Sequence, residues 1–180
     1  MDCNRYRDVI CAEQGRVRLD NGRYIHANWI TALGEQRFIC TQGPLETTCA
    51  DFWTMIVQEN IEGIVMLCDT VEQNKTKCHQ YWPTPDKKQL HFANKTITVH
   101  FIEETALEPD LYRTKLSVLS RNGSMNRTDW NTGGAAHCLR YSAAWTSTQH
   151  PLVGAQPPSA SGPKCADAGP IPLHILRDFA

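Results

Sequence analysis

An amphipathic helix pattern leads directly into a short apolar strand, and this succession indicates the fold class. The helix pattern covers residues 47–59, and a wholly apolar run follows at residues 64–67. The apolar side chains that recur at helical intervals of four and three are Cys49, Trp53 and Ile56. Thr48 and Asp51 predict a capping pair at the helix start, and the apolar run predicts a strand buried on both faces.

Alternating apolar and polar residues predict further strands on both sides of this helix. Short segments of this kind lie at residues 16–19, 24–29 and 37–40, between turn-forming residues. Residues 97–101 and 112–118 also alternate, and a Glu-Pro-Asp turn between them predicts an antiparallel hairpin. Because strands surround a helix and a buried strand, the pattern predicts a mixed α/β domain.

Charged residues are concentrated in the first part of the chain. Residues 1–130 hold 32 of the 37 charged residues, whereas the last 31 residues hold six of the ten prolines. We therefore expect two parts, an ordered domain at residues 1–119 and a low-charge Pro/Ala/Ser/Gly-rich tail at residues 120–180 that is poorly ordered. A truncated product, a splice form or translation in the wrong frame would each produce such a break.

The overall charge and the apolar runs exclude several classes of function. The net charge of −1 offers no basic footprint for nucleic acid and no polybasic patch for a membrane surface. The longest apolar run, Ile64 to Cys68, falls far short of the ~20 residues of a membrane span. Charged residues at positions 2–8 stand where a secretory signal would be apolar, so we expect a cytoplasmic protein.

The eight cysteines predict reduced thiols, several of them in the core. The sequence contains no Cys-x-x-Cys pair, which argues against a zinc ribbon or a thioredoxin-type centre. An even number of cysteines is compatible with disulfides, but we expect a reducing compartment for this chain. The sequence therefore predicts no metal ion and no other cofactor.

Six short segments occur in a fixed order and carry a family resemblance. They are Asn4-Arg5-Tyr6-Arg7-Asp8-Val9, Tyr24-Ile25-His26-Ala27-Asn28, Thr41-Gln42-Gly43-Pro44-Leu45, Phe52-Trp53-Thr54-Met55, Ile64-Val65-Met66-Leu67 and Lys77-Cys78-His79-Gln80-Tyr81-Trp82-Pro83. Together they resemble the conserved blocks of the protein tyrosine phosphatase domain, in the cysteine-dependent, phosphotyrosine-specific family. The likeness covers residues 2–119, and it implies an incomplete phosphatase-like α/β domain with a twisted mixed sheet, flanking helices and an irregular C-terminal tail.

The resemblance implies four substrate-binding residues. In the family, a tyrosine at the position of Tyr6 lies against the phosphotyrosine ring, and an acid at the position of Asp8 holds the substrate backbone. A glutamate at the position of Glu72 pairs with the phosphate-binding arginine, and a lysine at the position of Lys77 reaches toward the substrate cleft. Without the resemblance, these residues would be exposed side chains near a terminus and at a charged hairpin tip.

The residues that would cleave a phosphate ester are missing from these 180 residues, so we predict no catalytic residue. The family places an arginine six positions after its nucleophilic cysteine, and none of the eight cysteines has an arginine there. Its Trp-Pro-Asp acid loop is absent too, because Thr84 follows Trp82-Pro83. Residues 169–174 resemble the lead-in to the catalytic loop, but Ile175 takes the place of the cysteine.

These observations leave three interpretations of the function. The family reaction removes phosphate from protein phosphotyrosine through a cysteinyl-phosphate intermediate, but this chain is expected to be inactive as written. It is alternatively a non-catalytic pseudophosphatase module that binds a phosphotyrosine protein or peptide, or a truncated form of a working enzyme. A half domain leaves strand edges and apolar surface uncovered, so we also expect self-association.

Overall fold

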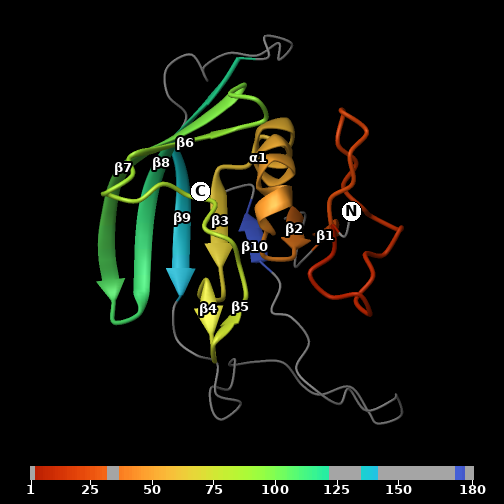
Figure 1. Ribbon diagram of the computed structural model, residues 1–180, viewed down its shortest axis with the longest axis horizontal. Coiled ribbons are helices and arrows are strands. Elements are labelled where there is room, and N and C mark those ends of the chain that lie inside the picture. Colours follow the sequence, from red (N-terminus) through yellow and green to blue (C-terminus); the bar gives the residue numbers. More distant parts are fainter. Residues whose placement is uncertain (1–2, 32–36, 122–134, 142–172, 177–180) are drawn as a thin grey trace.

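The computed structural model describes residues 3–31, 37–121, 135–141 and 173–176, the last two ranges as backbone only. In this part of the chain, eight strands form one sheet in the order β1-β2-β10-β3-β9-β8-β7-β6 (Figure 1). They are β1 (Ala27–Thr31), β2 (Arg37–Thr41), β3 (Gly63–Met66), β6 (Gln89–Phe92), β7 (Ile97–Glu108), β8 (Leu111–Ser120), β9 (Ala135–Tyr141) and β10 (Leu173–Leu176). β3 and β9 are parallel and the other pairs are antiparallel, so the sheet is mixed, as predicted.

The helix α1 (Cys49–Gln58) lies against the β2–β10–β3 part of this sheet, as Figure 1 shows. A 3₁₀ turn, η1 (Glu46–Thr48), leads into it, and Asn60 with a φ of 51° follows its end. The buried side chains that join the helix to the strands are Phe52, Trp53, Met55, Ile56, Ile39, Ile64, Met66, Val99 and Leu116. The predicted apolar stripe of the helix is therefore the face that packs on the sheet, and burial of that face stabilises the helix.

The capping pair predicted for the helix start does not form. Thr48 is the N-cap residue, but its side chain makes no capping hydrogen bond to the helix. Asp51 instead accepts two hydrogen bonds from the guanidinium of Arg23, at 2.6 and 3.0 Å. The prediction was wrong because a partner distant in the sequence competes for the same carboxylate, and a bidentate ion pair is the stronger interaction.

Two hairpins match the expected turn chemistry. β7 and β8 are antiparallel, and Asp110 in the predicted turn has a φ of 66°. A second hairpin consists of β4 (Val71–Glu72) and β5 (Lys75–Thr76). Its two central residues, Gln73 and Asn74, both have positive φ, which matches the right-handed twist of short hairpins.

Two local predictions differ from the structure. The segment at residues 16–19 alternates in burial as expected, but it forms only an isolated bridge between Arg16 and Asn28. The sequence pattern also gave no sign of β6, which pairs with β7. Most of the proposed tail lies outside the described residues, so the division at residue 119 stays a prediction.

The two strands described beyond that division belong to the main sheet. β10 lies between β2 and β3, and β9 lies between β3 and β8. Ile175, where the resemblance would expect the family's catalytic cysteine, is therefore part of the strand β10. Within the described ranges no helix is long and apolar enough to cross a membrane.

Candidate functional site

Arg5 clamps the N-terminal loop to two other segments of the chain. Its guanidinium donates to the carbonyl oxygens of Gly43 (3.1 Å from both Nε and Nη2), Pro44 (2.7 Å) and Thr76 (3.2 Å). The peptide N–H of Arg5 also donates to the side-chain oxygen of Gln42 at 2.9 Å. A planar cation with donors on two edges can satisfy several carbonyl groups at once, so Arg5 joins the first segment to the 42–44 turn and to the end of β5.

The residue before Arg5 attaches the same loop to the strand region. The side-chain oxygen of Asn4 accepts a hydrogen bond from the Tyr24 hydroxyl at 2.9 Å and lies 3.1 Å from the Nδ1 atom of His26. The side-chain amide of Gln42 donates to the carbonyl oxygen of Cys3 at 2.8 Å. Side chains of Tyr24, His26 and Gln42 thus hold the chain at Arg5 and at the two residues before it.

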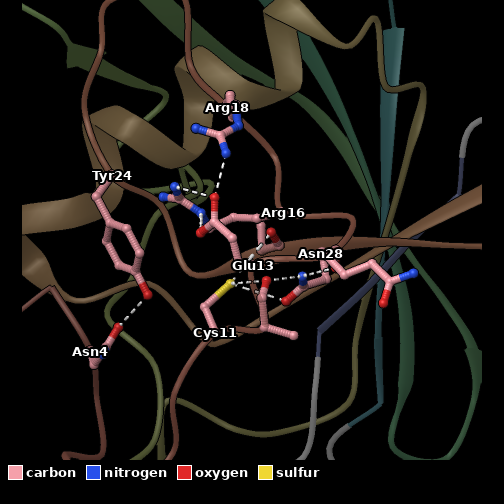
Figure 2. A network of polar contacts seen from close by, with 10 residues as sticks. Asn4, Cys11, Glu13, Arg16, Arg18, Tyr24 and Asn28 are labelled. Carbon is pink, nitrogen blue, oxygen red and sulfur yellow. Dashed lines mark hydrogen bonds and ion pairs between the residues drawn. The ribbon is translucent and has the colours of Figure 1, made fainter.

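A second polar network holds the segment that follows this loop, and Figure 2 shows it beside the Asn4–Tyr24 pair. Glu13 accepts from Arg16 at 2.9 Å and also pairs with Arg18. The Arg16 guanidinium lowers the pKa of the Glu13 carboxyl. The Asn28 amide donates to the carbonyl oxygen of Ala12 at 2.7 Å, which attaches the segment to β1.

The 42–44 turn approaches the segment after β5 so closely that only glycine fits. A Cβ atom on Gly43 would lie 2.8 Å from the Lys77 carbonyl oxygen and 3.2 Å from the Sγ atom of Cys78. The peptide N–H of His79 donates to the Pro44 carbonyl oxygen at 2.9 Å. Segments that are far apart in the sequence therefore converge at this turn.

Three of the four predicted substrate-binding residues lie next to Arg5 or to its contacts, and the fourth, Glu72, lies in the neighbouring strand β4. Tyr6 is half-buried and Asp8 is exposed, both in the turn directly after Arg5. Lys77 is half-buried and directly follows Thr76, whose carbonyl oxygen Arg5 contacts. Glu72 lies in β4, where its carboxylate accepts a hydrogen bond from the Asp69 N–H at 3.1 Å.

Arg5 has no role predicted from the sequence, although it lies inside the first of the six resembling segments. The signal that could have identified it is a basic residue directly before the predicted Tyr6–Asp8 wall. Its partners lie 38, 39 and 71 positions away along the chain, and a sequence pattern does not reveal such contacts.

The thiols described by the structure differ in how readily they ionise. Burial and the nearby Glu46 raise the pKa of Cys49 to about 12. The pKa of Cys78 is raised by a hydrogen bond to Cys68 and by burial, whereas the same hydrogen bond lowers the pKa of Cys68. A thiolate is the nucleophilic form of cysteine, so Cys68 is the more reactive of these thiols. Among the described residues, no group of three His, Cys, Asp or Glu side chains could hold a metal ion.

Comparison with known proteins gives one consistent family. The family model described as "Protein-tyrosine phosphatase" matches residues 1–152. Tyrosine-protein phosphatase 69D of Drosophila melanogaster is 43% identical over 57% of this chain and 8% of that protein. The human tyrosine-protein phosphatase non-receptor type 2 is 42% identical over 56% of this chain and 25% of that protein. The chain thus spans a quarter or less of the length of these two relatives.

Solved structures agree with this result. The catalytic domain of human protein tyrosine phosphatase non-receptor type 18 aligns with a TM-score of 0.68 and 27% identity, over 83% of this chain and 52% of that domain. The phosphatase PTPN18 in complex with HER2-pY1196 phosphopeptides aligns with the same TM-score over 78% of this chain and 48% of that one. Since the family model covers most of the sequence and the predicted blocks converge in the fold, the chain belongs to the protein-tyrosine phosphatase family.

Proposed function

We propose that this chain is a non-catalytic member of the family that binds phosphotyrosine peptides without hydrolysing them. The observation that carries the proposal is the set of hydrogen bonds that the Arg5 side chain donates. Its guanidinium donates to three backbone carbonyl oxygens, and these contacts support a wall formed by Tyr6 and Asp8 next to the segment that carries Lys77.

The retained wall supports recognition of an aryl phosphate. In the proposed complex the Tyr6 ring lies against the phosphotyrosine ring, a contact worth ~1 kcal/mol. Asp8 holds the peptide backbone, and Lys77 provides a positive charge for the phosphate. The family likeness to a phosphatase solved with phosphopeptides supports this class of ligand.

Three observations support binding without turnover. Within the 180 residues no cysteine is followed six positions later by arginine, so the usual partners of the thiolate and the phosphate are missing. Arg5 does not replace that arginine, because its guanidinium contacts carbonyl groups of the 42–44 turn and of β5. Among the residues whose side chains the structure describes, no arginine pairs with Glu72, which accepts from the Asp69 N–H.

The expected affinity for a phosphopeptide follows from the few groups that are available to bind its phosphate and ring. A single lysine and one aromatic ring contribute far less than a nest of amide groups with an arginine fork. We therefore expect a preference for the phosphorylated over the unmodified peptide of roughly tenfold or less, since tenfold corresponds to about 1.4 kcal/mol. Contacts to the peptide outside the phosphate supply the rest.

The proposal is tested by measuring binding and phosphate release on the same preparation. Fluorescence anisotropy compares a labelled phosphotyrosine peptide with its tyrosine version, and a phosphate assay follows hydrolysis of a small aryl phosphate. We expect weaker phosphopeptide binding for Tyr6→Ala, near-normal binding for Tyr6→Phe, and no phosphate release above buffer.

A matched pair of acidic variants serves as the control. Asp8→Asn removes the proposed contact to the peptide backbone, whereas Asp20→Asn removes an exposed acid remote from the proposed wall. Equal binding of both peptides, or an equal effect of both variants, contradicts the binding proposal. Phosphate release that a thiol alkylator abolishes would instead show an active enzyme. The cytoplasmic location also stays a prediction.

A further inference from the structure

Two threonines in the sequence are followed three positions later by an acidic residue, and no serine is. They are Thr48, followed by Asp51, and Thr105, followed by Glu108. A carboxylate at this spacing marks the substrates of acidic-directed serine/threonine kinases, because basic side chains of the kinase bind it. The sequence alone therefore leaves two candidate acceptors for a phosphate group.

The structure separates these two threonines by the access to their hydroxyl groups. Thr48 is 5% exposed, and its hydroxyl oxygen accepts a hydrogen bond from the Leu45 N–H at 2.9 Å. Asp51 is buried as well, so a kinase would have to open the helix start to reach either group. Thr105 and Glu108 are both exposed.

Thr105 lies in the outer half of β7, on the face that points away from the core. β6 pairs with β7 at residues 97–100, and beyond Phe101 no described strand lies along that edge of β7 (Figure 1). The neighbouring Glu104 accepts a hydrogen bond from the buried Thr114 at 2.7 Å. Because side chains alternate between the two faces of a strand, Thr105 points to the opposite, exposed face of an extended segment.

The charges around Thr105 complement a basic kinase groove. The acidic residues within five positions of it are Glu103, Glu104, Glu108 and Asp110, and all four are exposed. Residues 96–112 contain no lysine or arginine. This segment therefore presents an exposed hydroxyl in a purely acidic stretch of chain, which favours capture by a positively charged groove.

A phosphate on Thr105 would have a cation directly across the hairpin. In the β7–β8 register Thr105 lies opposite Arg113, and Glu103 lies opposite Lys115. Residues that are directly opposite in antiparallel strands have Cβ atoms about 4.5–5.5 Å apart. Arg113 is exposed and forms no ion pair with the side chains that the structure describes. Its guanidinium can therefore turn to a phosphate on Thr105 and donate charge-assisted hydrogen bonds.

We propose that Thr105 is the acceptor site for an acidic-directed protein kinase and that Arg113 binds the resulting phosphate across the hairpin. The Thr105 hydroxyl oxygen attacks the γ-phosphorus of ATP, the bond from that phosphorus to the β–γ bridging oxygen breaks, and ADP leaves. The hydroxyl proton passes to a carboxylate of the kinase. The new group carries a charge of about −1.5 to −2, which opposes pairing of the β7 edge with a second chain.

Phosphorylation of the folded 180-residue chain by purified casein kinase 2 and ATP tests the site, with mass spectrometry to count and locate the phosphate. We expect about one phosphate per chain, at Thr105. Thr105→Val should abolish incorporation, and Glu108→Gln should lower its initial rate about tenfold, because the kinase loses a contact to a charged group. Thr31→Val is the matched control, since Thr31 is an exposed strand residue with Gly34 three positions later. Incorporation at another residue, or none into the folded chain, would overturn the site.

Phosphorus NMR of the phosphorylated chain tests the contact with Arg113. The second pKa of the phosphate should be lower in the folded chain than in the same chain in urea, because the guanidinium stabilises the doubly charged form. Arg113→Gln should remove most of this difference, whereas Lys95→Gln, which changes an exposed cation in the turn before β7, should leave it in place. An unchanged pKa on folding, or equal effects of the two variants, would overturn the pairing across the hairpin.

Discussion

The guanidinium of Arg5 connects three carbonyl groups, two from the 42–44 turn and one from the end of β5. Hydrogen bonds of this kind, from a charged donor at a partly buried position, contribute about 1.5–3 kcal/mol each when their partners have no alternative. Gly43 and Pro44 are buried and Thr76 is exposed, so water can replace the lost donor mainly at Thr76. Arg5 therefore contributes to stability as well as to the position of the segment that carries Tyr6 and Asp8.

Arg5→Ala should lower the free energy of unfolding by about 2 kcal/mol, because three carbonyl groups lose a charged donor. Arg5→Lys should recover less than half of this loss, because an ammonium group cannot span the same carbonyl groups as a planar fork. Urea denaturation followed by tryptophan fluorescence measures both values. Arg113→Ala, on the exposed side of β8, is the control and should change stability by less than about 0.5 kcal/mol. Equal losses for Arg5→Ala and Arg113→Ala would contradict the clamp.

Cysteine alkylation as a function of pH separates the described thiols. The pKa of Cys49 in the folded protein is about 12, above its ordinary value of 9.0, so its alkylation rate should keep rising between pH 8 and 10. The lowered pKa of Cys68 predicts a half-maximal alkylation rate below pH 9.0, so its rate should level off at lower pH than that of Cys49. The rates come from mass spectrometry after brief iodoacetamide pulses on the native protein. A plateau for Cys49 at lower pH than for Cys68 would contradict the assigned environments.

The raised pKa of Cys49 also affects the free energy of unfolding at high pH. A thiol with a raised pKa in the folded state stabilises the fold fully below the pKa of the unfolded chain. This contribution is lost as the pH rises from 9.0 toward about 12, because the unfolded state releases the proton first.

Among the elements, α1 and its contacts show what could be predicted and what could not. The spacing of apolar residues gave the helix to within a few residues of Cys49–Gln58, because that stripe is the face buried on the sheet. The capping pair predicted from Thr48 and Asp51 was wrong, because Asp51 pairs with Arg23. That partner lies 28 positions away in the sequence, where a local pattern does not reveal it. Residues 16–19 were predicted as a strand but form only an isolated bridge at Arg16. The alternation of apolar and polar residues indicates which side chains are buried and does not indicate strand pairing.

Arg23→Ala tests whether Asp51 acts in an ion pair or as a helix cap. The Asp51 side chain is 3% exposed and that of Arg23 is 57% exposed, so the variant leaves a buried carboxylate without its cation. We expect a loss of about 1–3 kcal/mol in the free energy of unfolding. Asp51→Asn should cost less, because a neutral amide is easier to bury. No loss for Arg23→Ala in thermal denaturation would mean that the ion pair adds no stability.

At the scale of the whole molecule, the six resembling segments gave the family because they contact one another in space. Asn4 contacts Tyr24, Arg5 contacts Gly43, and the Trp53 indole donates to the Tyr81 carbonyl oxygen at 2.8 Å. The positions of β9 and β10 inside the sheet could not be predicted. Their strand partners are distant in the sequence, and their segment has no regular charge or apolar pattern that marks it as core.

The described surface also bears on self-association, which stays a prediction. Ile30 is 41% exposed on the edge strand β1, and Ile102 is 51% exposed on β7. Exposed apolar residues on a strand at the edge of a sheet favour pairing with a second chain. Ile102 lies beyond residues 97–100, the part of β7 that pairs with β6, so Ile30→Lys and Ile102→Lys should both shift sedimentation toward the monomer. Ile10→Lys, which changes an exposed residue outside any strand, should have a smaller effect. A wild-type chain that remains monomeric at all concentrations would contradict this expectation.

The central proposal is tested most directly by one titration. A labelled phosphotyrosine peptide is titrated with the purified chain, and released phosphate is measured in the same cuvette. The account predicts saturable binding that is stronger than for the tyrosine peptide, weaker for Tyr6→Ala, and accompanied by no phosphate release. Release of phosphate in proportion to the chain, lost after thiol alkylation, would contradict it. Identical binding of the two peptides would contradict it equally.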